Sequence, residues 1–141
     1  MSINPNLMID GDAALTLVNP HPWLHHKQVD HAPCGQVDPS KIVFFQTMKS
    51  DGVNLSCKTR QANLNPVNIN VLVFLERNRS ILDRVPLHCW YVVATETRFI
   101  SERDECYFKC LSRGENGTGW QFGWVNEAGG SVSFAVVAFT S

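Results

Sequence analysis

Three large aromatic residues, Trp120, Phe122 and Trp124, alternate with smaller or polar residues near the end of the chain. Side chains of an extended strand point alternately to its two faces, so this spacing places all three rings on one face. Such a surface is strongly apolar and needs to be covered by other parts of the chain. The segment is therefore predicted to be a strand on which the rest of the fold is organised.

A second apolar segment, residues 131–141, ends the sequence and carries apolar residues at odd and even positions alike. This pattern is typical of a strand inside a sheet that is covered on both faces. The polar, glycine-containing residues 126–130 between the two segments predict a hairpin connection. We therefore expect residues 118–141 to form a hairpin of two apolar strands.

The rest of the sequence also shows short strand-like segments separated by turn residues. Asp51 and Gly52 predict a tight turn between two strands, and residues 81–84 predict a helical turn that ends before Pro86. Further strands are predicted over residues 42–48, 53–59, 68–76, 87–99 and 105–111. Seven or eight short strands with almost no helical periodicity favour an all-β fold, an antiparallel β-sandwich of which the jelly roll is one form.

The first forty residues differ from the rest of the chain, because they contain five of the seven prolines and four of the five histidines. Proline lacks a backbone donor and has a fixed φ, so residues 1–40 are predicted to be an extended arm that packs on the domain. A length of 141 residues corresponds to a single domain. Residues 41–141 are expected to form its β-sandwich body.

The composition argues against several classes of protein. A formal charge of −1 does not provide the concentrated basic surface of a nucleic-acid-binding module, and 44% hydrophobic residues argue against disorder. No apolar run reaches the roughly 18 residues of a transmembrane helix, and residues 1–5 lack the features of a signal peptide. We therefore expect no membrane insertion, and a protein that is either cytoplasmic or part of a larger assembly such as a virion.

The five cysteines do not form the pattern of a disulfide framework. Cys57 is predicted to lie on the inward face of the strand over residues 53–59. Cys106 and Cys110 share one face of another predicted strand, but about 13 Å separates their Cα atoms, which is too far for a disulfide bond. The thiols are expected to act as small buried apolar groups.

A cluster of histidines precedes Cys34, and imidazole and thiolate groups are the ligands that zinc prefers. His25, His31 and Cys34 are close enough in sequence for a turn to bring them together as a metal site. No H-E-x-x-H or C-x-x-C pattern supports such a site. A solvated arm without a cofactor and a pH-sensing segment are the other two interpretations.

The sequence lacks the motifs of common catalytic sites: no G-x-S-x-G elbow and no phosphate-binding P-loop occurs. We therefore favour a non-catalytic recognition or assembly module that binds a glycan, a receptor protein or a partner subunit. It is expected to be lectin-like, or a projecting domain of a larger assembly such as a viral capsid. The candidate binding residues are Arg79, Glu115, Asn116, Trp120 and Trp124. The alternative is a metal-dependent hydrolase on a jelly-roll scaffold that uses the histidine cluster.

The uncharged final strand also predicts how the protein assembles. As an open edge, residues 129–141 would pair with strands of other chains. The strand must therefore lie inside its own sheet, or a second copy must cover it. The second possibility leads to the hypothesis of a homo-oligomer, a dimer or trimer with residues 120–124 or 132–139 near the contact.

Overall fold

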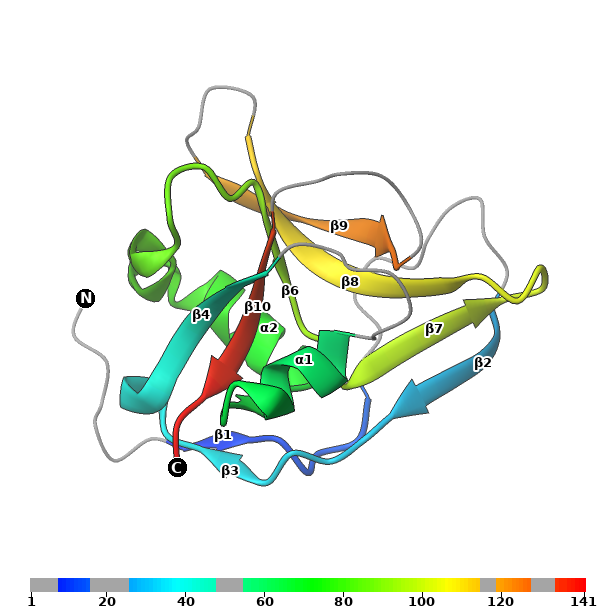
Figure 1. Cartoon of the computed structure of the whole chain (residues 1–141), viewed down its shortest axis with the longest axis horizontal. Coiled ribbons are helices and arrows are strands. Elements are labelled where there is room, and N and C mark those ends of the chain that lie inside the picture. The colour runs from blue at the N-terminus through cyan, green and yellow to red at the C-terminus, as the bar shows by residue number, and fades with distance from the viewer. Residues whose placement is uncertain (1–7, 16–25, 48–54, 115–118, 128–133) are drawn as a thin grey trace.

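The computed structural model describes residues 8–15, 26–47, 55–114, 119–127 and 134–141 (Figure 1). Strands are the dominant element, which confirms the prediction of a mostly β protein. The elements are β1 (Ile9–Asp10), β2 (His26–His31), β3 (Gln36–Val37), the 3-10 helix η1 (Pro39–Lys41), β4 (Ile42–Thr47), α1 (Leu55–Gln61), β5 (Asn65–Pro66), α2 (Ile69–Arg77), the 3-10 helix η2 (Arg79–Arg84), β6 (Tyr91–Val93), β7 (Thr97–Ser101), β8 (Cys106–Arg113), β9 (Trp120–Asn126) and β10 (Phe134–Phe139). The helical turn expected over residues 81–84 lies within η2, and the strand expected over residues 105–111 is β8.

In the described ranges, eight strands form one curled sheet around the long strand β8. β9 pairs with β8 along nearly its whole length, while β6 and β7 share the opposite edge of β8. β6 continues to β10 and β4, and β7 continues to β2. Because β6 and β10 run parallel, the sheet is mixed, and the prediction of an antiparallel sheet throughout is wrong.

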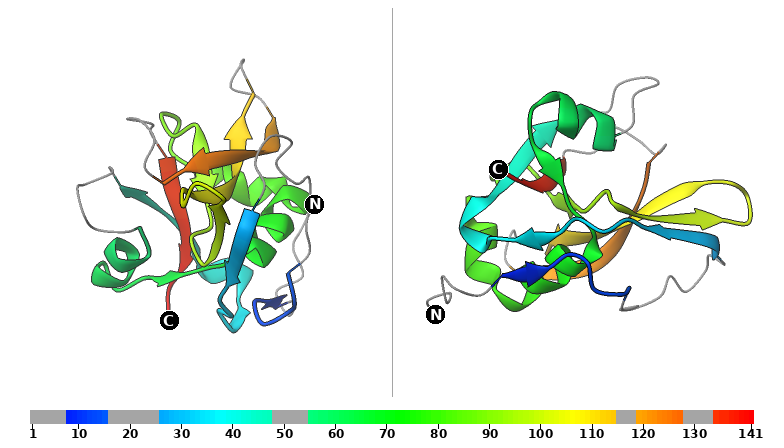
Figure 2. Two further views of the ribbon diagram at one scale, coloured as in Figure 1. Left: turned by 90° about the vertical axis from the view of Figure 1, so that its right-hand side faces the viewer. Right: turned by 90° about the horizontal axis from the view of Figure 1, so that it is seen from below.

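Helices cover both faces of this sheet. α1 lies on one side and α2 on the other (Figure 2). The only other sheet in the described part of the chain is the two-stranded pair of β1 and β3. The second large sheet of a β-sandwich or jelly roll is therefore not found in the residues described.

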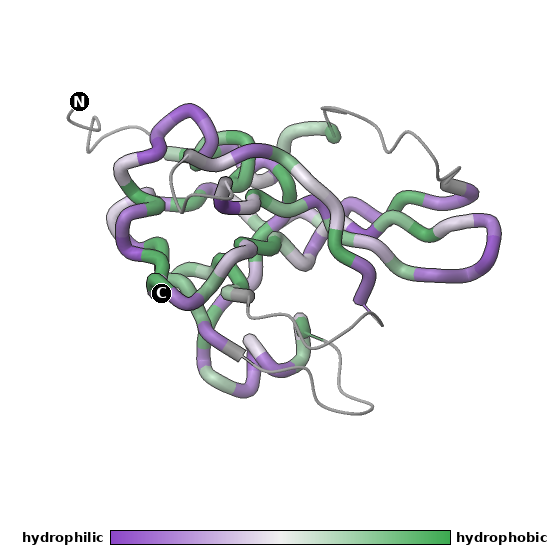
Figure 3. The backbone as a smooth tube through the Cα atoms, turned by 90° about the horizontal axis from the view of Figure 1, so that it is seen from above, coloured by the Kyte–Doolittle hydropathy of each residue, from purple (hydrophilic) through white to green (hydrophobic). Residues whose placement is uncertain are grey.

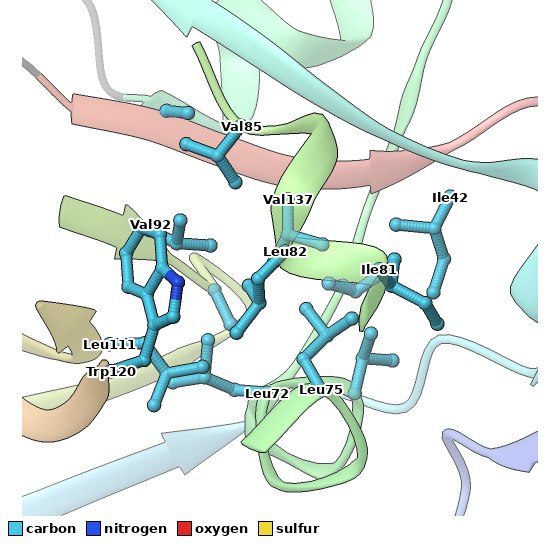
Figure 4. Close-up of a cluster of buried hydrophobic side chains, with 14 of the residues drawn as sticks. Ile42, Leu72, Leu75, Ile81, Leu82, Val85, Val92, Leu111, Trp120 and Val137 are labelled. Carbon is cyan, nitrogen blue, oxygen red and sulfur yellow. The ribbon is translucent and has the colours of Figure 1, made fainter. Parts of the chain in front are cut away.

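The larger hydrophobic core lies between the sheet and the α2–η2 segment. Its side chains come from η2, α2 and the facing strands, and Trp120 packs beside Val92 and Leu111 at one end (Figure 4). A smaller core on the opposite face joins Leu55 of α1 to Phe108 and to residues of the central strands. The strands between the two cores are consequently buried on both faces.

The prediction of a strand over residues 68–76 is wrong, because this segment is the helix α2. Ile69, Leu72 and Leu75 recur every third residue and are buried on the helix face that meets the sheet. Asn68 precedes them, and its side-chain oxygen accepts a hydrogen bond from the Asn70 backbone N–H, as a helix N-cap does. The many β-branched residues suggested a strand, but a helical stripe also fits this sequence, and burial against the sheet selects it.

The predicted return strand over residues 53–59 is also wrong. Leu55 and Thr59, which are four residues apart, form the buried face of the helix α1. Cys57 therefore projects away from the core and is exposed, rather than inward as expected. The predicted turn at Asp51 and Gly52 lies outside the described residues.

Two strands occur where the aromatic and terminal segments were predicted, but they do not form a hairpin with each other. β9 pairs with β8, and β10 lies between β4 and β6 with β5 beside its end. Val137 of β10 belongs to the larger core and Val136 to the smaller one. The strand is thus inside its own sheet, and its apolar faces are covered within one chain. The homo-oligomer stays a prediction.

The segment predicted as one strand over residues 87–99 is divided into β6 and β7. At the break, the Glu96 N–H donates to the Val67 carbonyl, and the Glu96 carbonyl accepts from the Ala32 N–H. The chain therefore leaves the strand direction at Glu96, whose backbone bonds with the segment before α2 and with the residue after β2. Further along, the turn between β7 and β8 is hydrophilic (Figure 3), and its Asp104 forms an ion pair with Lys27 of β2.

Part of the first forty residues belongs to the sheets. β2 is a strand of the main sheet, and Ile9 and Val37 are buried in the larger core. The amide of Asn68 donates to the Gly11 carbonyl at 2.6 Å and to the Ala32 carbonyl at 3.0 Å. The start of α2 is thereby attached to two separate segments of the N-terminal region. Among the helices of the described residues, none has the length and hydrophobicity needed to cross a membrane.

We predict that Asn68→Ala lowers the free energy of unfolding by roughly 2–4 kcal/mol, because it removes the helix cap and leaves two carbonyl groups without this donor. Urea unfolding followed by circular dichroism measures the change. Gln61→Ala, which removes an exposed amide at the end of α1, is the control, with an expected change below about 0.5 kcal/mol. Equal effects of the two substitutions would contradict the role of Asn68.

Candidate functional site

A cleft of about 190 Å³ opens between α1 and the sheet, on the face of the smaller core. It is smaller than the roughly 300–1,000 Å³ of clefts that bury drug-sized ligands. Its lining is mainly polar and charged. The lining residues are Ser56, Cys57, Arg60, Glu96, Arg98, Phe108 and Glu127.

Five structural elements contribute to the cleft. α1 provides Ser56, Cys57 and Arg60, and Glu96 comes from the break between β6 and β7. Arg98 of β7 and Phe108 of β8 share the sheet face that α1 covers, since Ile100 is paired with Cys106 and side chains alternate along both strands. Glu127 follows the end of β9. The site therefore depends on the docking of α1 against the sheet.

The first charged pair of the cleft joins Arg60 of α1 to Glu96. The Ser56 hydroxyl lies 3.1 Å from the second carboxylate oxygen of Glu96 and 3.1 Å from the Thr95 hydroxyl. The carboxylate is the more buried partner, with 12% of its side chain exposed against 57% for Arg60. The pair connects α1 to the break between β6 and β7, and its arginine is the partner that is exposed to solvent.

The second charged pair joins Arg98 Nη2 to Glu127 Oε2 at 3.1 Å. Arg98 Nε also donates to the Cys106 sulfur at 3.3 Å. Burial alone lowers the pKa of Arg98, but the contacts with Cys106 and Glu127 outweigh it, so the pKa is raised and the group stays charged. Here too the carboxylate is the less exposed partner.

Two thiols of β8, Cys106 and Cys110, are poor nucleophiles. Burial raises the pKa of Cys106 to about 11 and that of Cys110 to about 12. Burial also raises the pKa of Cys34, which packs against the larger core. Because the thiolate is the reactive form, these three groups are unreactive near neutral pH.

Two of the three predicted metal ligands, His31 and Cys34, lie in the described part of the chain. His25 lies outside the described residues. His31 Nε2 lies 3.1 Å from the Ala13 carbonyl oxygen and Nδ1 lies 2.9 Å from the Thr97 hydroxyl, so both ring nitrogens have hydrogen-bond partners. Cys34 is half-buried and packs against the larger core. No group of three metal-ligating side chains occurs in the part of the chain that the structure describes.

The predicted binding residues that the structure describes do not line the cleft. Arg79 is exposed and forms an ion pair with Glu76 at 2.9 Å. Trp120 is a core residue with 9% exposure, and its ring lies 4.5 Å from the guanidinium carbon of Arg113. Trp124 packs edge-to-face against Phe99 at 4.8 Å. Glu115 and Asn116 lie outside the described residues.

The aromatic stripe encloses a lysine. Lys109 is paired with Trp124 across β8 and β9, and its ammonium nitrogen lies 4.5 Å from the Trp124 ring and 5.5 Å from the Phe122 ring. Only 2% of the residue is exposed, and burial lowers the pKa of Lys109 to about 8. The rings provide cation–π contacts to this charge. Lys109 faces away from the cleft, because neighbouring Phe108 faces into it.

No protein family, curated protein or solved structure matches this chain. The interpretation of the site therefore depends on its own geometry.

The charged residues of the cleft were missed in the sequence. Arg60 and Glu96 are 36 positions apart, and Arg98 and Glu127 are 29 apart. No short motif links residues at such separations.

We predict that the contribution of Lys109 to stability increases between pH 8 and pH 9, so that the wild type gains stability over this range relative to a variant without the amine. The folded-state pKa of about 8 lies below the unfolded value of 10.5, so the unfolded chain binds more protons in this window. Stability then rises with pH, by about 1 kcal/mol across this pH unit for one such group. Urea unfolding at pH 7, 8 and 9 measures it.

Lys109→Met is the matched variant, since it keeps an unbranched side chain and removes the titrating group. Its unfolding free energy should lack this rise. The raised pKa values of Cys106 and Cys110 act in the opposite direction and already do so between pH 8 and pH 9, because the unfolded thiols titrate near pH 9, so the difference between the two proteins is compared at each pH. The same pH dependence of stability in both proteins would show that Lys109 makes no such contribution.

Proposed function

We propose that the protein is a non-catalytic recognition module, which binds one polar group of a glycan or of a receptor protein in the cleft between α1 and the sheet. The observation that carries the proposal is the pairing of the cleft's charged groups, Arg60 with Glu96 and Arg98 with Glu127. Both pairs line a small open cleft. The proposal covers a free, lectin-like protein as well as a projecting domain of a larger assembly such as a viral capsid.

The chemistry of the cleft supports binding rather than catalysis. A nucleophilic site needs an activated group, and the thiol beside Arg98 has a raised pKa. Each carboxylate that lines the cleft is held by an arginine instead of standing in the apolar surroundings that favour a general acid. Fixed donors and acceptors in a small cleft are the features of a recognition site.

The size of the cleft limits the ligand. A cleft of about 190 Å³ holds one sugar unit or one side chain of a larger partner, so most of the partner remains outside. Affinity for a single such group is expected to be low. The overall affinity of such a protein for a partner increases when several linked copies bind it at once, which is consistent with the hypothesis of a homo-oligomer.

We predict that Cys57→Trp abolishes ligand binding without loss of folding. Cys57 lines the cleft and is exposed on α1, so the larger side chain fills the cleft and leaves the cores intact. A glycan array, with a parallel screen of peptides, measures binding of wild-type protein and variant. The control is Ala62→Trp, which adds the same ring at an exposed position just after α1 and outside the cleft lining.

Binding should be retained by the Ala62 variant and lost in the Cys57 variant. If both variants bind as the wild type does, recognition occurs elsewhere on the molecule. Turnover of a bound glycan by the purified protein would show instead that the module is an enzyme.

A further inference from the structure

The two ion pairs of the cleft are asymmetric in their exposure. The side chains of Arg60 and Arg98 are 57% and 39% exposed, whereas those of Glu96 and Glu127 are 12% and 22% exposed. A ligand that approaches from solvent therefore meets the guanidinium groups before it reaches the carboxylates. This arrangement favours a ligand that carries a negative charge on the group that enters the cleft.

Both arginines keep donors that are available to such a ligand. Within the described part of the chain, Arg60 bonds only through Nη2, and Arg98 bonds through Nε and Nη2. The Nε and Nη1 groups of Arg60 and the Nη1 group of Arg98 make no hydrogen bond there. A guanidinium group holds a carboxylate through paired, charge-assisted hydrogen bonds.

The other residues that line the cleft indicate whether its carboxylate ligand is an acidic side chain of a protein or a sugar acid. The Glu96 and Glu127 carboxylates are acceptors, and the Ser56 hydroxyl both donates and accepts. An acidic protein side chain has no donor for these acceptors, whereas a sugar acid has hydroxyl groups beside its carboxylate. Phe108 adds an apolar surface at the same cleft, against which a ring can pack.

We propose that the cleft binds the carboxylate-bearing sugar of an acidic glycan. Arg60 and Arg98 hold the carboxylate, while Glu96, Glu127 and Ser56 bind the hydroxyl groups. This assignment rests on the recognition function proposed above and adds the chemical class of the ligand. Because the arginines are partly exposed, the affinity decreases as the salt concentration rises.

Titration calorimetry tests the assignment with the full chain and a panel of methyl glycosides. The panel contains glucuronate, galacturonate and N-acetylneuraminate, each with a neutral counterpart that lacks the carboxylate. At least one acid should bind tenfold or more tightly than its counterpart, because one charge-assisted hydrogen bond accounts for about that factor. N-acetylglutamate is included as a carboxylate of protein type and should bind weakly.

Arg60→Gln should weaken binding of the acid roughly tenfold or more, with Arg60→Lys intermediate because it keeps the charge but not the paired donors. Arg77→Gln is the matched control: it removes the same charge from an exposed position on α2, on the other side of the sheet, and should leave binding unchanged. Circular dichroism establishes that each variant is folded.

Equal binding of acid and neutral sugars, lost in Cys57→Trp, would overturn the assignment to acidic sugars and leave the recognition function in place. Tighter binding of N-acetylglutamate than of any sugar acid would assign the cleft to an acidic protein partner instead. Absence of binding by every member of the panel, or unchanged binding by Arg60→Gln, also overturns the assignment. The array result with Cys57→Trp and Ala62→Trp then decides separately whether the cleft recognises any ligand.

Discussion

The burial of the central strands on both faces is the constraint on which the rest of the structure depends. β10 contributes Val137 to one core and Val136 to the other, and β8 contributes Leu111 and Phe108 in the same way. Strands of this kind are stable only when each face is covered. In this chain α2 and η2 cover one face and α1 covers part of the other, so a single curled sheet needs no second sheet opposite it.

The cleft is a consequence of this arrangement. α1 has only seven residues and cannot cover the whole face of the sheet. Where α1 ends its cover, polar side chains of the helix meet polar side chains of the sheet and of its connecting loop, and opposite charges pair there, as Arg60 and the loop residue Glu96 do. Arg60 and Arg98 lie at the edge of the area that α1 covers, so they are partly exposed and belong to neither core. The binding chemistry and the limit of the hydrophobic core therefore have one structural cause.

On the opposite face of the sheet, the charged residue Lys109 is buried instead of exposed. Lys109 is enclosed by Phe122 and Trp124, and burial lowers the pKa of this amine toward neutrality. The aromatic stripe thus contributes to the interior, where it surrounds a cation, and Trp120 continues it into the larger core. A stripe of rings in the sequence can be either a binding surface or a core, and the pairing of β9 with β8 decides between them.

The sequence by itself determined that the protein is mostly β and that residues 120–126 and 134–139 are strands, because alternation and continuous apolar runs are local patterns. Only the tertiary structure decided that residues 69–77 are a helix, since their β-branched side chains fit either state until burial against the sheet selects one. It also decided the partners of β10 and the charged pairs of the cleft. These contacts join residues dozens of positions apart, and no spacing within a single segment records which distant segments will meet.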